Sequence, residues 1–213
     1  MSSIQYVVDS YYKHLAMGNL ALATGPIKVA LLAEFSPTYP AWAASTGYAI
    51  GDIVVPTTPT GRRYRATTTG SSGSSEPTWP TAEGGTVTDN SVIWEEYGGE
   101  HANVEFFNEV LANELPDGNG YTMGGKVLAN KSLTQDPEEP RAFLWDADDV
   151  LWESITATVK TAWIYVDGAT PGTDDFVISY ILLDDTPASV SINSVDLSLK
   201  FNSDGIHKIT RKV

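Results

Sequence analysis

The feature that most constrains the fold of this chain is an abrupt change of sequence character between residues 36 and 98. Across this stretch the helical spacing of apolar residues disappears, proline recurs, and Thr and Ser dominate. Prolines and clustered small polar residues divide a chain into short elements joined by turns. Three short β-branched or aromatic runs remain, at residues 53–55, 63–67 and 91–95. They predict a small all-β unit.

The segments on either side of this stretch keep regular apolar patterns. Residues 4–17 carry apolar side chains at helical spacing and predict a helix. Residues 27–32 form a continuous apolar run that is typical of a buried strand. Helical spacing returns at residues 104–111. Six further strands are expected, at residues 126–133, 141–145, 155–166, 176–183, 189–192 and 195–201.

This organisation predicts a mainly β protein made of two parts. Residues 1–35 and 99–213 are expected to form a β-sandwich-like host domain with one or two short helices, and residues 36–98 an inserted small β module, called the insert below. Insertion at an exposed loop is well tolerated because the chain leaves and returns at one place on the surface. Pro37 and the pair Gly98-Gly99 are the expected boundaries. One continuous irregular sandwich is the alternative.

The chain is strongly acidic, with 27 Asp and Glu against 13 Lys and Arg and a formal net charge of -14. This charge disfavours a phosphate backbone or an anionic membrane surface as a partner. The absence of cysteine excludes disulfides, thiolate zinc sites and thiol catalysis. No apolar run approaches the roughly 18–20 residues of a membrane helix, and the first residues lack a signal-peptide pattern. We therefore expect neither nucleic acid nor membrane as a partner.

Several stretches of the host domain, in order, resemble a family of small structural proteins of tailed bacteriophages. The most specific of them is Trp145-Asp-Ala-Asp-Asp-Val-Leu-Trp152. The chain departs from the common pattern of that family by carrying the insert in the loop after the first buried strand. The other matching stretches are residues 27–32, 108–110, 120–130, 157–165, 178–181 and 201–206.

The insert is similar to a short aromatic module of phage virion proteins and to the small chitin-binding type of carbohydrate module. The similarity rests on the pair Gly51-Asp52, on the run Glu76-Pro-Thr-Trp-Pro80, and on tryptophans in a fixed order. It spans the whole insert.

These resemblances imply a non-enzymatic structural protein of a tailed phage virion, made in the cytoplasm of the infected bacterium. They imply that it decorates the capsid exterior and projects the insert outward. The implied partners are the major capsid protein or other virion proteins, further copies of the chain in a homotrimer, and a bacterial surface glycan. A tail or head-fibre component is the alternative within this class. A stand-alone carbohydrate-binding or adhesion module and a cell-wall glycosidase are the alternatives outside it.

The aromatic residues of the insert have two interpretations. Trp42, Tyr64 and Trp79 would form a platform on which a sugar ring stacks, because the weakly positive C–H groups of a sugar match the negative face of an aromatic ring. Alternatively, Trp42, Tyr64 and Trp94 fill the core of a domain too small to have another one. Trp79 lies between two prolines and is the least core-like of the four.

The charged residues indicate no chemistry of their own. The acidic stretch 136–149 would suit calcium, but it lacks the twelve-residue calcium-loop pattern, and a solvated turn between strands is the better interpretation. Arg62, Arg63 and Arg65 either bind acidic groups of a neighbouring subunit or occupy exposed positions of a strand. The three histidines lie in no catalytic or metal signature. We therefore expect no catalytic residue, no metal and no cofactor.

Overall fold

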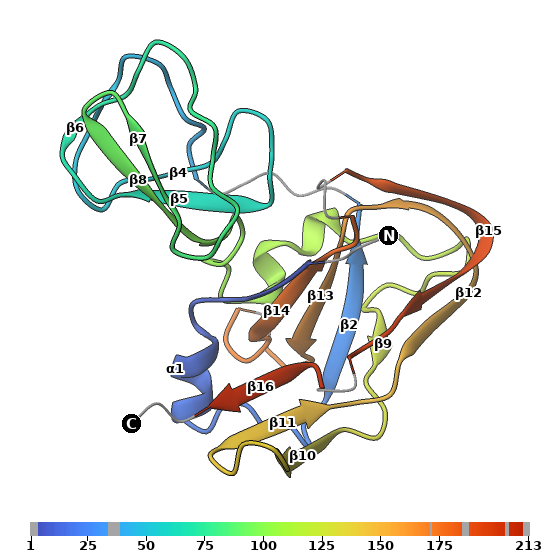
Figure 1. The fold of residues 1–213 in the computed structure, drawn as a ribbon. Coiled ribbons are helices and arrows are strands. Elements are labelled where there is room, and N and C mark those ends of the chain that lie inside the picture. Colours follow the sequence, from blue (N-terminus) through green and yellow to red (C-terminus); the bar gives the residue numbers. More distant parts are fainter. Residues whose placement is uncertain (1–3, 34–38, 171, 185–187, 203–204, 211–213) are drawn as a thin grey trace.

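The computed structural model describes residues 4–33, 39–170, 172–184, 188–202 and 205–210 (Figure 1). As predicted, the fold is mainly β, with 45% strand, 6% helix and several antiparallel sheets. No helix among these residues has both the length and the apolar character to cross a membrane.

The host domain is built on a five-stranded antiparallel sheet in the order β1-β14-β13-β2-β9. Every side chain of β14, which lies between β1 and β13, is buried, so both faces of the sheet are covered there. This explains why its strands read as continuous apolar runs rather than as an alternating pattern. The strands are β1 (Ile4–Val7), β2 (Ile27–Leu32), β9 (Lys126–Val127), β13 (Thr161–Val166) and β14 (Val177–Leu182).

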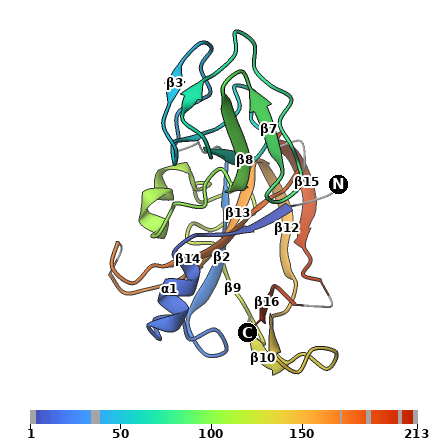
Figure 2. The same ribbon diagram turned by 60° about the vertical axis from the view of Figure 1, so that its left-hand side comes forward.

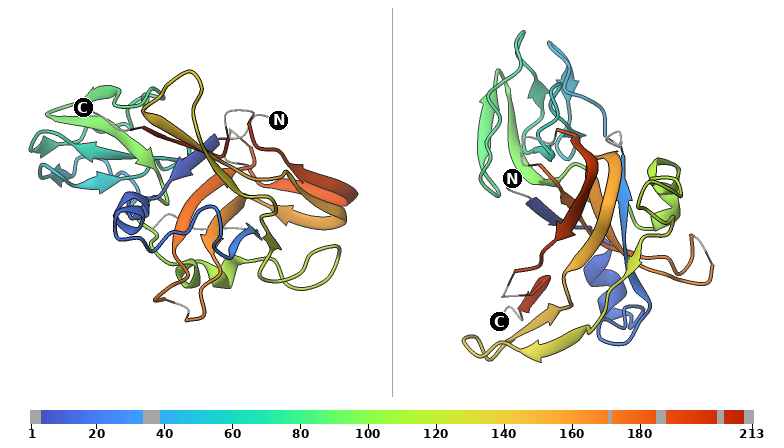
Figure 3. Two further views of the ribbon diagram at one scale, coloured as in Figure 1. Left: turned by 90° about the horizontal axis from the view of Figure 1, so that it is seen from below. Right: turned by 90° about the vertical axis from the view of Figure 1, so that its right-hand side faces the viewer.

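A second group of strands packs against the same core. Trp145, Trp152 and Ile155 from this group are fully buried in one apolar cluster with residues of β2, β13 and β14. Figure 3 shows the long, bent ribbon of β12 and β15 at one side of the domain. The group consists of β10 (Ser132–Gln135), β11 (Ala142–Asp146) and β16 (His207–Thr210) in one sheet, and of β12 (Val150–Val159) with β15 (Val190–Leu199) in another.

The insert is a separate small β unit at one end of the molecule (Figure 2). Its main sheet has the order β4-β5-β8-β7, and its apolar core does not merge with that of the host domain. The predicted strands 53–55, 63–67 and 91–95 correspond to β4, β5 and β8. The strands of the insert are β3 (Gly47–Tyr48), β4 (Ile53–Val54), β5 (Arg62–Ala66), β6 (Gly70–Ser71), β7 (Thr86–Asp89) and β8 (Val92–Gly99).

The two predicted helices are largely wrong. Residues 4–7 form β1, which pairs with β14, and only α1 (Tyr11–Ala16) is helical. The β-branched and aromatic residues of this segment suit a strand, and pairing with the edge of a sheet overrides their helical spacing. The expected helix at residues 104–111 is two short 3-10 turns, η1 (Phe107–Glu109) and η2 (Leu111–Asn113).

Three strand predictions differ from the structure in their connectivity. The expected strand 126–133 is two short strands, β9 and β10, which belong to different sheets. The expected strand 155–166 is divided at Lys160, because β12 and β13 belong to different sheets. The expected strands 189–192 and 195–201 are one strand, β15, whose register against β12 shifts near Ser194. Ser194 on β15 and Ser154 on β12 both have a positive φ, and they bend the ribbon.

Candidate functional site

The core of the insert is organised around one buried carboxylate. The indole N–H groups of Trp42 and Trp94 both donate to Asp89 Oδ2, at 2.8 and 3.1 Å, and Gly73 N–H donates to Asp89 Oδ1 at 2.7 Å. Trp42 and Tyr64 are buried, at 7% and 0% exposure. Trp42 and Tyr64, two of the three residues predicted to form a sugar platform, are thus core residues. This agrees with the alternative interpretation, in which they fill the centre of the insert together with Trp94. The reason is that six small strands leave the insert few other side chains to fill its centre.

Trp79 is the member of the predicted platform that keeps part of its ring accessible. One face of the ring stacks on Tyr64, with ring centroids 4.3 Å apart. Its indole N–H donates to Glu76 Oε1 at 2.8 Å, and Thr57 N–H donates to the same oxygen at 2.9 Å. Tyr64 in turn donates to Pro80 O at 2.8 Å. The loop around Trp79 is therefore fixed on both sides.

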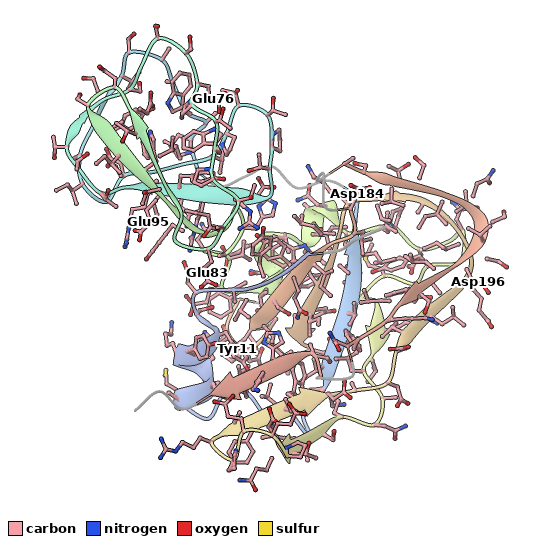
Figure 4. The ribbon with its side chains drawn as sticks, viewed as in Figure 1. Tyr11, Glu76, Glu83, Glu95, Asp184 and Asp196 are labelled. Carbon is pink, nitrogen blue, oxygen red and sulfur yellow. The ribbon has the colours of Figure 1, made fainter. Side chains whose placement is uncertain are left out.

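The Glu76 carboxyl is ionised at neutral pH. Burial alone would raise its pKa, but hydrogen bonds from Thr57 and Trp79 hold the pKa below its usual value. Figure 4 places Glu76 in the part of the insert that points away from the host domain. A partly exposed indole can stack on one face of a sugar, and a fixed carboxylate beside it can accept hydrogen bonds from the hydroxyl groups of that sugar.

A buried arginine joins the insert to the host domain. Arg63 on β5 is 2% exposed and donates to both carboxylate oxygens of Asp9, at 2.8 and 2.9 Å. It also donates to Tyr97 O at 2.8 Å and to the Tyr39 hydroxyl. Asp9 lies in the turn between β1 and α1 of the host domain. Four hydrogen bonds to one guanidinium thus fix the base of the insert.

Neither interpretation of the arginine cluster describes its role. Arg62 pairs with Glu96 at 2.9 Å and Arg65 with Glu95 at 2.7 Å, so all three arginines bind carboxylates of their own chain. A neighbouring subunit is not needed to pair them, and Arg63 is not an exposed strand residue. The sequence could not reveal this, because Asp9 is 54 residues away from Arg63.

Two glycines bring the insert into close contact with the host sheet. A Cβ on Gly99 would lie 1.9 Å from the Tyr180 hydroxyl and 2.6 Å from Tyr6 Cγ. A Cβ on Gly61, whose φ is +75°, would lie 2.3 Å from Leu182 Cδ1. Both positions therefore need glycine, because only a residue without a side chain allows this approach.

An open cleft of about 730 Å³ lies between the insert and the host domain. Figure 4 shows Glu83 and Glu95 on the side of the insert that faces the host domain. The arginines in the cleft wall are already paired with carboxylates, and Arg65 also lies 4.1 Å from the centre of the Tyr97 ring. Of these ion pairs, Arg63–Asp9 joins the two parts, and Arg62–Glu96 and Arg65–Glu95 lie within the insert.

The histidines lie apart and each has local contacts. His14 Nε2 lies 2.9 Å from Glu105 Oε1, and His207 Nε2 lies 2.9 Å from Gln5 Nε2. His101 is fully buried beside Glu100, with 3.2 Å between His101 Nε2 and Glu100 Oε1. Within the described ranges, no group of three or more His, Asp or Glu side chains is placed to hold a metal ion.

The acidic stretch 136–149 closes turns in the structure. Asp136 Oδ1 accepts the N–H groups of Glu138 and Glu139, and its Oδ2 lies 2.6 Å from Lys208 Nζ. The hydrogen bond with Lys208 holds the pKa of Asp136 below its usual value. Further along, Asp148 accepts a hydrogen bond from Asn130 at 2.7 Å. These contacts favour the turn interpretation over calcium binding.

Comparison of the chain with family models, with curated proteins and with solved structures finds no match. The resemblance to phage structural proteins therefore stays a prediction from the sequence motifs.

Proposed function

We propose that this chain is a non-enzymatic structural protein of a tailed phage particle, most simply a decoration of the capsid exterior. In this role the host domain binds the major capsid protein or another virion protein, and the insert points outward. We expect three copies to assemble together where the shell has local three-fold axes, since closed symmetry is the rule for homo-oligomers.

The observation that carries the proposal is the fixed junction. The insert has a core of its own and is attached to the host domain by a buried arginine and two close glycine contacts. A module held in one orientation suits repeated display, because many weak sites on one particle add up by avidity. A flexible tether would not give each copy the same direction.

The outward end is proposed to contact a bacterial surface glycan through Trp79. This residue is partly exposed and lies beside an ionised carboxylate in a loop fixed by hydrogen bonds. A fixed loop loses little conformational entropy on binding. In this proposal Tyr64 supports the loop from the core, where Trp42 is also buried, and neither residue contacts the sugar.

Proteomics of purified particles tests the proposal. Gradient-purified phage is separated into heads and tails, and this chain is quantified by mass spectrometry against the major capsid protein. A fixed ratio to the capsid protein in the head fraction supports decoration, and a fixed ratio in the tail fraction supports the tail alternative. Absence from both fractions, together with binding of the free chain to chitin or peptidoglycan, would favour a stand-alone adhesion module.

A further inference from the structure

The host domain carries an acidic groove that shares no residue with the cleft beside the insert. Its volume is about 460 Å³, and it is lined by the η1 and η2 turns, the segment 117–124 and the loop between β13 and β14. Figure 3 (right) shows the 3-10 turns and that loop on one flank of the domain. Asn108 N–H donates to Asp175 Oδ2 at 2.8 Å and holds the two segments together.

One wall of the acidic groove is apolar. Phe107 and Tyr165 stack face to face, with ring centroids 3.8 Å apart and an interplanar angle of 8°. Leu111 and Met123 complete the wall and are 44% and 52% exposed. Unbranched and flexible side chains such as Met adapt to aliphatic ligands of different shapes. This wall suits the alkyl stem of a long side chain.

Carboxylates surround this apolar wall. Glu114, Asp117, Asp167 and Asp175 all line the groove, and the only ion pair that involves any of them in the described residues joins Asp167 to Lys28, at 2.8 Å. Burial and then the negative charges of Glu114, Asp167 and Asp175 raise the pKa of the Tyr165 hydroxyl above its usual value. The groove therefore has an excess of negative charge over a short distance.

Glu114 adds a buried carboxyl to the wall of the groove. It is 8% exposed, and its Oε1 accepts both the Tyr121 hydroxyl and Gly124 N–H, each at 2.6 Å. Its Oε2 is buried without a hydrogen-bond partner. A buried carboxyl oxygen without a donor costs free energy, and burial accordingly raises the pKa of Glu114. This buried carboxyl adds to the carboxylates of Asp117 and Asp167, which are exposed in the groove.

We propose that the acidic groove binds a lysine or arginine side chain of a partner protein. The alkyl stem packs on Leu111, Met123 and the Phe107 ring, and the cationic group meets the carboxylates. Long basic side chains combine these two properties, and their charged hydrogen bonds to carboxylates are among the stronger ones in proteins. The site does not depend on the proposed role in a particle, because a basic side chain of any partner would fit it.

The test is an NMR titration of the full ¹⁵N-labelled chain with N-acetyl-arginine methylamide. Its uncharged counterpart, N-acetyl-norleucine methylamide, and guanidinium chloride serve as comparison ligands. The variants are Glu114→Gln, which keeps an oxygen for Tyr121 and Gly124, and Asp167→Asn. Asp196→Asn on the β12–β15 ribbon is the matched control outside the groove, and thermal melting shows that each variant is folded.

We expect the arginine compound to shift amides at residues 107–124 and 165–175, with at least a fivefold loss of affinity in both groove variants and none in the control. Norleucine should bind at least fivefold more weakly. Absence of groove shifts, or equal shifts near every acidic residue, would overturn the proposal. Guanidinium binding as tightly as the arginine compound would also overturn it, since the groove would then be a site for a small cation.

Discussion

At the scale of single residues, Asp89 is the centre of the insert. Its two oxygens accept hydrogen bonds from two tryptophans and one backbone N–H. Both indole N–H groups and the carboxylate therefore have hydrogen-bond partners inside the core. Trp79 packs outside this centre, against the ring of Tyr64. Trp42 and Trp94 therefore fill the core of the insert, and Trp79 lies at its edge.

The stabilities of two tryptophan variants should separate these roles. Trp94→Ala removes a fully buried ring and should lower the free energy of unfolding by about 3–5 kcal/mol. Trp79→Ala removes a partly exposed ring and should cost less, about 1–3 kcal/mol, while abolishing any binding to immobilised chitin or peptidoglycan. Urea unfolding followed by circular dichroism measures both. Equal losses of stability would show that Trp79 is a core residue as well.

His207 should make the stability of the host domain depend on pH. Burial lowers its pKa to about 4, and its Nε2 lies 2.9 Å from the Gln5 amide nitrogen, which is a donor to neutral imidazole. The unfolded chain has a histidine pKa of about 6.5, so it binds a proton between about pH 6.5 and 4 that the folded chain does not. The free energy of unfolding should therefore fall by about 3 kcal/mol as the pH decreases through this range.

The variant His207→Gln isolates this effect, because other buried groups titrate in both proteins. His101 is one of them, since burial lowers its pKa too. Urea unfolding across this pH range should give a smaller decrease for the variant than for the natural chain. The same slope in both proteins would contradict the assignment of a buried, neutral His207.

At the scale of elements, the sequence indicates strands better than it indicates their pairing. The run 27–32 and the segment 176–183 are predicted almost as observed, because a strand buried on both faces is apolar at every position. The segment 4–7 is missed because its helical spacing and its strand-forming residues compete. Only pairing with β14, more than 170 residues later, decides the outcome.

The other missed strands have the same cause. They are short or polar, and neighbours distant in the sequence define them. Contacts between distant residues also define the candidate site. The density of aromatic residues indicates the insert, but no pattern in the sequence indicates that Asp89 binds two tryptophans or that Asp9 binds Arg63. The strands without a sequence signal are β3, β6, β7 and β16.

The contact between β5 and the turn after β1 should control the orientation of the insert. Asp9→Asn removes the charge that pairs with Arg63, and we expect a loss of about 1–2 kcal/mol in stability, because hydrogen bonds to charged groups are the stronger ones. The amide of Glu100, which donates to Gly61 O at 3.0 Å, should exchange with deuterium faster. Asp52→Asn, within the insert, is the control. Unchanged exchange at Glu100 in the Asp9 variant would show that the glycine contacts alone fix the insert.

At the scale of the whole molecule, two apolar cores meet at a junction of charged and aromatic groups. Replacing residues 36–98 with a short Gly-Ser linker should leave a host domain that melts cooperatively. It should be less stable than the full chain, because Tyr6 and Leu182 lose the insert that covers them. Thermal melting by circular dichroism distinguishes the outcomes, and loss of cooperative melting would contradict a host domain that folds alone.

The proposed role also predicts the orientation of the insert on the particle, because the junction gives every copy of the insert the same angle to the host domain. A cryo-EM map of the phage particle that carries this chain tests it most directly. The predicted result is density for the host domain in contact with the particle surface, and uncovered density for the insert farther out at a constant angle. A map in which the chain is absent from the particle, or in which the insert is buried against the shell, would contradict the display of the insert.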